Sequence, residues 1–89
     1  MSWKIELTDQ ALKQLKKMGQ GEARRITHYL RKRIEPLDNP RQLGKNLKGG
    51  LSELWRYRVG DYRLICEIRE NELIVLVVRI GHRKGVYQK

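Results

Sequence analysis

The chain has 89 residues, of which 39% are hydrophobic and 34% are charged. Because a chain this short buries only about 60–65% of its unfolded surface, we expect a single domain without space for a large cofactor pocket. Twenty Lys and Arg residues against ten Asp and Glu residues give a net charge of +10. This charge favours polyanionic partners, with nucleic acid first and an acidic protein second.

Composition also argues against membranes and oxidising compartments. No segment approaches the roughly 18 consecutive apolar residues of a membrane-spanning helix, and the first residues contain no apolar secretory core. The one cysteine, Cys66, cannot form an intramolecular disulfide, which fits a reducing compartment. We therefore expect a cytoplasmic protein that does not bind a membrane.

The first third of the chain predicts a strand followed by a helical hairpin. Residues Trp3 to Leu7 alternate as in a short strand, and Thr8 has the side chain of a helix N-cap. A second helix is expected from about Gly21 to Ile34, before Pro36. In the first helix, which should end at Gly19, the apolar residues at helical spacing are Ala11, Leu12, Leu15 and Met18.

The rest of the chain predicts a loop and then an antiparallel sheet. Leu37 to Gly50 is polar and contains proline and glycine, so we expect a loop there. The period then becomes two in three segments joined by short turns, which are Leu54 to Val59, Tyr62 to Arg69 and Leu73 to Ile80. Connections this short force an antiparallel meander. The expected fold is α+β, with element order β-α-α-β-β-β, a small antiparallel sheet and both helices on one face.

Alternation along the strands separates an inner from an outer face. Arg56 and Arg58 point away from the apolar side chains of their strand, and Arg63 does the same on the next strand. Three arginines can therefore converge on the face away from the helices. The side chains expected to be buried between the sheet and the helices are Trp55, Tyr57, Leu64 and Leu76.

Several familiar kinds of site do not fit this sequence. It has no Walker phosphate loop, no CxxC pair and no HExxH motif, and two histidines and one cysteine cannot build a zinc site. We therefore expect neither a metal nor an organic cofactor. Cys66 lies among apolar residues and is interpreted as a buried, inert thiol, and His28 as a surface residue.

Two basic segments remain, and each has two interpretations. The run from Gly81 to Tyr87 is either a solvated tail or a segment that brings His82, Arg83 and Tyr87 close to the sheet arginines. Arginine binds phosphate through paired donors, and an aromatic ring can stack on a base. The second helix carries a cluster that is either a solvated helix face or a contact with structural RNA, consisting of Arg24, Arg25, Arg31, Lys32 and Arg33.

Longer motifs carry a family resemblance. They are Asn39-Pro40-Arg41, Gly44-Lys45-Asn46-Leu47-Lys48-Gly49, Leu54-Trp55-Arg56-Tyr57-Arg58-Val59-Gly60-Asp61-Tyr62-Arg63-Leu64, and the closing Gly81-His82-Arg83 with Val86-Tyr87. Together they cover nearly the whole chain, and it resembles the RelE family of toxin–antitoxin modules. The resemblance implies a ribosome-dependent endoribonuclease that cleaves mRNA in the A site and so inhibits translation. It also implies contacts with ribosomal RNA and neutralisation by a small RelB-like antitoxin.

The resemblance also assigns residues. Arg56 and Arg58 replace lysines of the best-studied type, so we expect them to stabilise charge rather than to act as bases. Tyr87 is the candidate base, and His82 is a second candidate for proton transfer because imidazole exchanges protons near neutral pH. The full set of expected catalytic residues is Arg56, Arg58, Arg63, Arg83, Tyr87 and His82. Further RNA contacts are expected from Arg24, Arg25, Arg31, Lys32, Arg33, Lys45, Lys48 and Lys84.

Two other functions stay open at this point. Toxins of the ParE type resemble the same fold but act on DNA gyrase, so the fold alone does not decide the target. In the other interpretation the arginines only bind phosphate, and the protein is a non-catalytic RNA-binding module. For the toxin interpretations, the net charge of +10 predicts an acidic, partly disordered antitoxin that folds along the basic surface.

Overall fold

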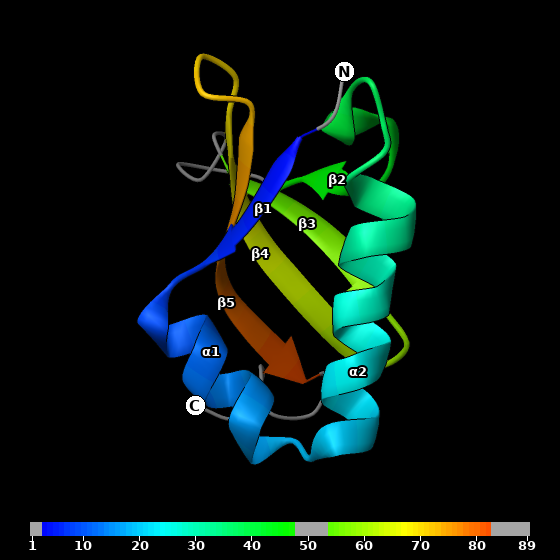
Figure 1. The fold of residues 1–89 in the computed structure, drawn as a ribbon, viewed down its shortest axis with the longest axis vertical. Helices are drawn as coiled ribbons and strands as arrows, with labels where there is room; N and C mark the ends of the chain where they lie inside the picture. Colours follow the sequence, from blue (N-terminus) through cyan, green and yellow to red (C-terminus); the bar gives the residue numbers. More distant parts are fainter. Residues whose placement is uncertain (1–2, 48–53, 83–89) are drawn as a thin grey trace.

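A computed structural model describes residues 3–47 and 54–82 of the chain (Figure 1). Its helical elements are α1 (Asp9–Lys17), α2 (Gln20–Tyr29), the π-helical turn η1 (Leu30–Ile34) that continues α2, and the 3-10 turn η2 (Pro40–Gln42). Its strands are β1 (Lys4–Leu7), β2 (Lys45–Asn46), β3 (Leu54–Val59), β4 (Tyr62–Arg69) and β5 (Ile74–His82). Within the described residues these strands form one sheet in the order β1-β5-β4-β3-β2.

The sheet has the predicted α+β arrangement. β3, β4 and β5 form the expected antiparallel meander, and β1 lies parallel to β5, so that the first and last of these strands are neighbours. Both α1 and α2 lie in front of the same face of the sheet in Figure 1. The other face of the sheet is left uncovered by these helices. The predicted fold class is confirmed.

Thr8 connects the start of α1 to the last strand. Its side-chain oxygen accepts a hydrogen bond from the Ala11 amide at 3.1 Å, as an N-cap does. Its hydroxyl also donates to the Val78 carbonyl of β5 at 2.6 Å. Thr8 therefore both starts the helix and fixes it against the sheet.

The segment predicted as a loop before β3 contains a short strand that the sequence pattern did not reveal. In this strand, β2, Lys45 is the partner of Arg56. Gly44 allows the close approach, because its φ is +79° and a Cβ atom there would collide with the Arg56 carbonyl oxygen. The Trp55 indole nitrogen donates to the Leu43 carbonyl at 2.6 Å. β2 has only two residues, which is too few to show an alternating pattern in the sequence. Contacts with neighbouring residues hold it in place.

The core lies between the helices and the covered face of the sheet. Tyr57 and Leu64 are fully buried there, as predicted. The Tyr57 hydroxyl donates to the Pro40 carbonyl at 2.6 Å. Trp55, which was expected to be buried, is only partly buried and packs at the margin. The buried cluster consists of Trp3, Ala11, Ile26, Leu30, Ile34, Tyr57, Val59, Leu64, Cys66, Ile68, Val75, Val77 and Ile80.

The prediction that Leu76 is buried in the core is wrong, and a β-bulge explains why. Midway along β4 the pairing with β5 shifts by one residue, which leaves Val78 as an extra residue in β5. Val77 before the shift and Ile80 after it are both buried in the core, although uniform alternation would put them on opposite faces. Leu76 therefore lies on the uncovered face and is half-buried.

Candidate functional site

The uncovered face of the sheet carries several cations at the end where β3 meets β4. Residues that are partners in neighbouring strands share a face. The strand register therefore decides which of these side chains are neighbours. One row across the sheet joins Arg58, Arg63 and Gly81, and the next joins Lys45, Arg56, Ile65 and Arg79.

Arg58 and Arg63 face each other in the first row. They are direct partners in the β3–β4 hairpin, which places their Cβ atoms about 4.5–5.5 Å apart. Gly81 continues the row on β5 and has no side chain to fill the space beside Arg63. Like charges placed opposite each other repel. An anion held between the two guanidinium groups would relieve this repulsion.

A polar pocket lies at this row. Its volume is about 300 Å³, and the described residues that line it are Arg58, Gly60, Asp61 and Arg63. Gly60 and Asp61 form the two-residue turn between the strands, and Gly60 has a φ of +60°, which favours glycine in such a turn. The turn therefore holds both arginines in register beside the pocket. The volume of the pocket is at the lower end of the range for small-molecule sites.

Arg56 lies in the second row, next to Lys45 of β2. On the other side of Ile65 the row ends with Arg79 of β5. Sequence reasoning missed Arg79. The signal was present, because a residue directly before an inward-facing one, here Ile80, points outward.

Three of the arginines at this end of the sheet form no ion pair with an acidic side chain of the described residues. Within the described ranges, no carboxylate forms an ion pair with Arg56, Arg58 or Arg79. At the far end of β4 the pattern is different, since Arg69 contacts the Glu67 carboxylate at 3.0 Å. The positive charges of Arg56, Arg58 and Arg79 are thus less compensated than that of Arg69.

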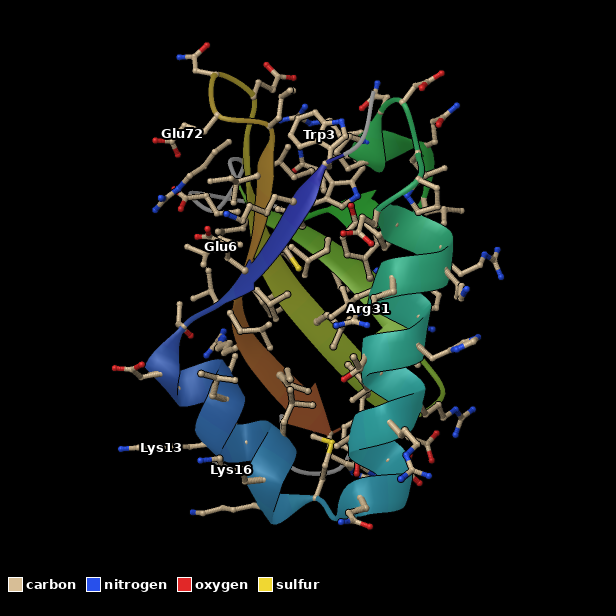
Figure 2. The ribbon with its side chains drawn as sticks, in the orientation of Figure 1. Trp3, Glu6, Lys13, Lys16, Arg31 and Glu72 are labelled. Atoms are coloured by element: carbon tan, nitrogen blue, oxygen red, sulfur yellow. The ribbon has the colours of Figure 1, made fainter. Side chains whose placement is uncertain are left out.

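The basic cluster predicted on the second helix divides into two groups. Arg25, Lys32 and Arg33 line a second pocket, of about 360 Å³, between α2 with its continuation η1 and the end of β3. Arg24 and Arg31 are also exposed but do not line this pocket. Figure 2 labels Arg31 on the helix. The helix therefore presents only part of its cluster toward the sheet.

His82 does not share the face of Arg63. It is the partner of Tyr62 at the end of β5, and the centroids of the two rings are 4.9 Å apart with an interplanar angle of 79°. Tyr62 packs against the core, so His82 points to the side that the helices cover, away from the sheet arginines. Its role in proton transfer stays a prediction. Lys48, Arg83, Lys84 and Tyr87 lie outside the described residues.

Burial removes three side chains from acid–base chemistry near neutral pH. Cys66 is fully buried, and burial raises the pKa of its thiol to about 12. This agrees with its interpretation as an inert thiol. Burial also raises the pKa of Tyr57 and of Tyr29. Neither phenol supplies a phenolate at neutral pH.

Two other features are absent from residues 3–47 and 54–82. No group of three or more His, Cys, Asp or Glu side chains is placed to hold a metal ion there. None of the helices in these ranges is both long and apolar enough to cross a membrane.

The sequence matches known toxins over most of its length. The family model described as the ParE toxin of the type II toxin–antitoxin system, parDE, matches residues 5–87. Toxin RelE of Mycobacterium tuberculosis (strain ATCC 25618 / H37Rv) is 36% identical over 52 residues, which cover 58% of this chain and 54% of that toxin. The match thus spans about half the length of this curated relative.

Solved structures share the fold. A chain of the toxin–antitoxin complex RelBE2 from M. tuberculosis has a TM-score of 0.83 at 23% identity, over 93% of this chain and 100% of that chain. A chain of the archaeal RelE–RelB complex from Pyrococcus horikoshii OT3 has a TM-score of 0.70 at 24% identity, over 93% of this chain and 97% of that chain. The isolated E. coli RelE toxin has a TM-score of 0.69 at 18% identity, over 90% of this chain and 83% of that chain. The chain therefore belongs to the ParE toxin family of type II toxin–antitoxin systems, as a toxin with the fold of the RelE toxins.

Proposed function

We propose that this toxin is an endoribonuclease that cleaves mRNA in the ribosomal A site and so inhibits translation. The observation that carries the proposal is the first row of the uncovered face, where Arg58 and Arg63 face each other at a polar pocket beside Gly81. Guanidinium groups stay charged and bind phosphate oxygens through paired donors. A phosphodiester is therefore a suitable ligand for this row.

Cleavage by transesterification makes three demands on the protein. The 2′-hydroxyl must lose a proton as its oxygen attacks the adjacent phosphorus. The negative charge of the resulting phosphorane must be stabilised, and the 5′-oxygen that leaves must gain a proton. Arg56, Arg58 and Arg63 meet the second demand, because donors fixed on paired strands need little reorganisation as charge develops.

The two proton transfers are assigned from the family resemblance. Tyr87 takes the proton of the 2′-hydroxyl, and Arg83 assists the leaving 5′-oxygen or holds the phosphate. His82 is the alternative proton carrier, and it ends β5 directly before Arg83. Arg56, Arg58 and Arg63 thus supply the charge stabilisation, and residues at the end of β5 and after it supply the proton transfers.

We also propose that an acidic, RelB-like antitoxin neutralises this toxin. Similar chains from M. tuberculosis and P. horikoshii were solved in a toxin–antitoxin complex and a RelE–RelB complex. The net charge of +10 would attract an acidic segment, and so would Arg56, Arg58 and Arg79, which form no ion pair with the described carboxylates. Co-purification with the protein encoded next to the toxin tests this. A basic neighbour that does not bind would contradict it.

A second function has one observation in its favour. The matching family is described as the ParE toxin, and toxins of the ParE type act on DNA gyrase. We favour the nuclease because charge stabilisation at a phosphodiester accounts for the opposed arginines, whereas gyrase inhibition does not call for them. A third possibility, RNA binding without cleavage, uses the same arginines.

An assay on translating ribosomes separates the three functions. Purified toxin is added to ribosomes programmed with a defined message, and RNA ends are mapped. The nuclease cuts in the A site, whereas a gyrase inhibitor leaves the message intact and produces gyrase-linked DNA breaks. Binding without either product indicates the non-catalytic module.

The same assay tests the chemistry. A message with one 2′-deoxynucleotide at the scissile position should bind almost normally and resist cutting, because it retains the phosphates but lacks the attacking hydroxyl. Efficient cutting of this message would rule out transesterification. If the deoxy message resists but Tyr87→Phe cuts at the normal rate, Tyr87 is not the base, and the role passes to the second candidate, His82.

A further inference from the structure

The proposed reaction leaves one basic groove unused. It lies between the helix formed by α2 and η1 and the end of β3, with a volume of about 360 Å³. No carboxylate is among the described residues that line it, although the Glu22 carboxylate lies 3.8 Å from the Arg25 guanidinium. The basic side chains and the glycine of its lining are Arg25, His28, Lys32, Arg33, Arg58 and Gly60.

Specific contacts position two of these cations. The Arg25 guanidinium lies over Gly60, since a Cβ atom added to that glycine would be 2.9 Å from the guanidinium carbon. The guanidinium carbon of Arg33 is 5.9 Å from the Tyr29 ring centroid, within cation–π range. On the side of β3 opposite β4, this half of the strand has no partner among the described residues, because β2 pairs only with the other half. The groove is thus already formed in the free protein.

Arg58 links this groove to the pocket on the uncovered face. Arg58 and Gly60 line both cavities, which lie on either side of the β3–β4 turn. Arg58 lies in the half of β3 that β2 does not cover, which lets it border both cavities. The two cavities therefore form one cationic path from the sheet arginines, past the turn, to α2.

We infer that this groove binds the phosphates of an RNA strand. An RNA backbone needs cations placed along a path and no apolar anchor, which describes the groove. An acidic peptide that folds on binding needs apolar pockets as well. Of the described apolar lining residues, Val59 is already buried in the core, and the Tyr29 ring packs against the core beneath the Arg33 guanidinium. The inference rests on the proposed function and extends it, because the path continues the substrate pocket.

The chain offers a charge-matched control. The test variant is Arg25→Gln with Lys32→Gln, and the control is Lys13→Gln with Lys16→Gln. Lys13 and Lys16 lie on α1 and point away from α2 (Figure 2). Each pair lowers the net charge by the same amount, and none of the four residues belongs to the core cluster. Thermal melts should show that both variants fold.

Binding is measured by fluorescence anisotropy with single-stranded RNA whose 2′-methoxy groups prevent cleavage. One probe is a trinucleotide. The other has about ten nucleotides, which is enough to span the longest dimension of the protein, 34 Å, even at the duplex spacing of about 3.4 Å per nucleotide. At about 0.1 M salt the test variant should bind the long probe about tenfold more weakly, and its salt slope should fall by about 0.7 for each phosphate that the variant no longer neutralises. The control variant and the trinucleotide should show little change.

Ribosomes that carry no message identify the source of the RNA. A loss of affinity for the long probe supports the inference with the message as ligand. A loss confined to message-free ribosomes supports it with ribosomal RNA as ligand. Equal losses for test and control variants, or a loss only for binding of polyglutamate, would overturn it. Because no cleavage is measured, a toxin that binds RNA here and cuts nothing would contradict the proposed nuclease and leave this inference intact.

Discussion

The two faces of the sheet are held by different forces. On the covered face, apolar side chains interlock with both helices, and the buried phenol of Tyr57 is hydrogen-bonded to Pro40. On the uncovered face, Arg56, Arg58 and Arg79 have positions set by strand register and no ion pair among the described residues. One face therefore supplies stability, and the other uses that stability to hold like charges close together. Substitutions on the two faces should have separable effects.

The largest effect is expected on the covered face, at Leu64. Leu64→Ala removes a fully buried side chain and should lower the free energy of unfolding by about 2–5 kcal/mol. Chemical denaturation measures this loss. Cleavage per folded molecule should stay close to the wild-type value, because Leu64 does not reach the arginine rows. A loss below about 1 kcal/mol would contradict the core assignment.

On the uncovered face, Arg63→Ala should impair chemistry rather than folding. Loss of one preorganised donor at the phosphorane should slow cleavage by about 10²-fold, which corresponds to about 2.7 kcal/mol. The melting temperature should hardly change. The matched control is Arg69→Ala, on the same strand and face but paired with Glu67 at the other end. If both variants cut equally well, Arg63 has no place in the site.

The smallest effect tests which side of β5 faces the core. Val77 is fully buried, whereas Leu76 is half-buried on the uncovered face. Val77→Ala should cost about 2 kcal/mol, and Leu76→Ala about 1 kcal/mol or less although it deletes more atoms. The two unfolding free energies, measured side by side, decide the matter. A larger loss of unfolding free energy for Leu76→Ala than for Val77→Ala would contradict the bulge in β5.

Patterns within one element predicted more of the structure than pairings between elements did. Alternation placed β3 and β4 to the residue and assigned Arg56, Arg58 and Arg63 to one face. The bulge in β5 was not predicted, because the residue that lies against it, Thr8, belongs to the other end of the chain and donates to Val78. β2 was missed for a similar reason, since it depends on a close approach at Gly44 rather than on its own pattern.

The candidate site follows the same division. The outward arginines of β3 and β4 could be found by counting along each strand, and Arg79 could have been found in the same way. The side chain direction of His82 could not, since it depends on the register of β5 with β4 beyond the bulge. The groove beside α2 was equally hidden, because it exists only where Arg25 meets Gly60. The pattern within one element predicts which residues are exposed. The packing of the elements decides which of these residues lie next to one another.

The pairing of β1 with β5 bears on how the toxin is made. Lys4 pairs with Ile74, and Thr8 donates to a carbonyl that lies 70 positions later in the chain. β5 separates β1 from β4 and supplies Val75, Val77 and Ile80 to the core. During synthesis the sheet therefore cannot close until β5 has left the exit tunnel. The complete arginine rows, which include Gly81 and Arg79 of β5, then form only after most of the chain has been synthesised.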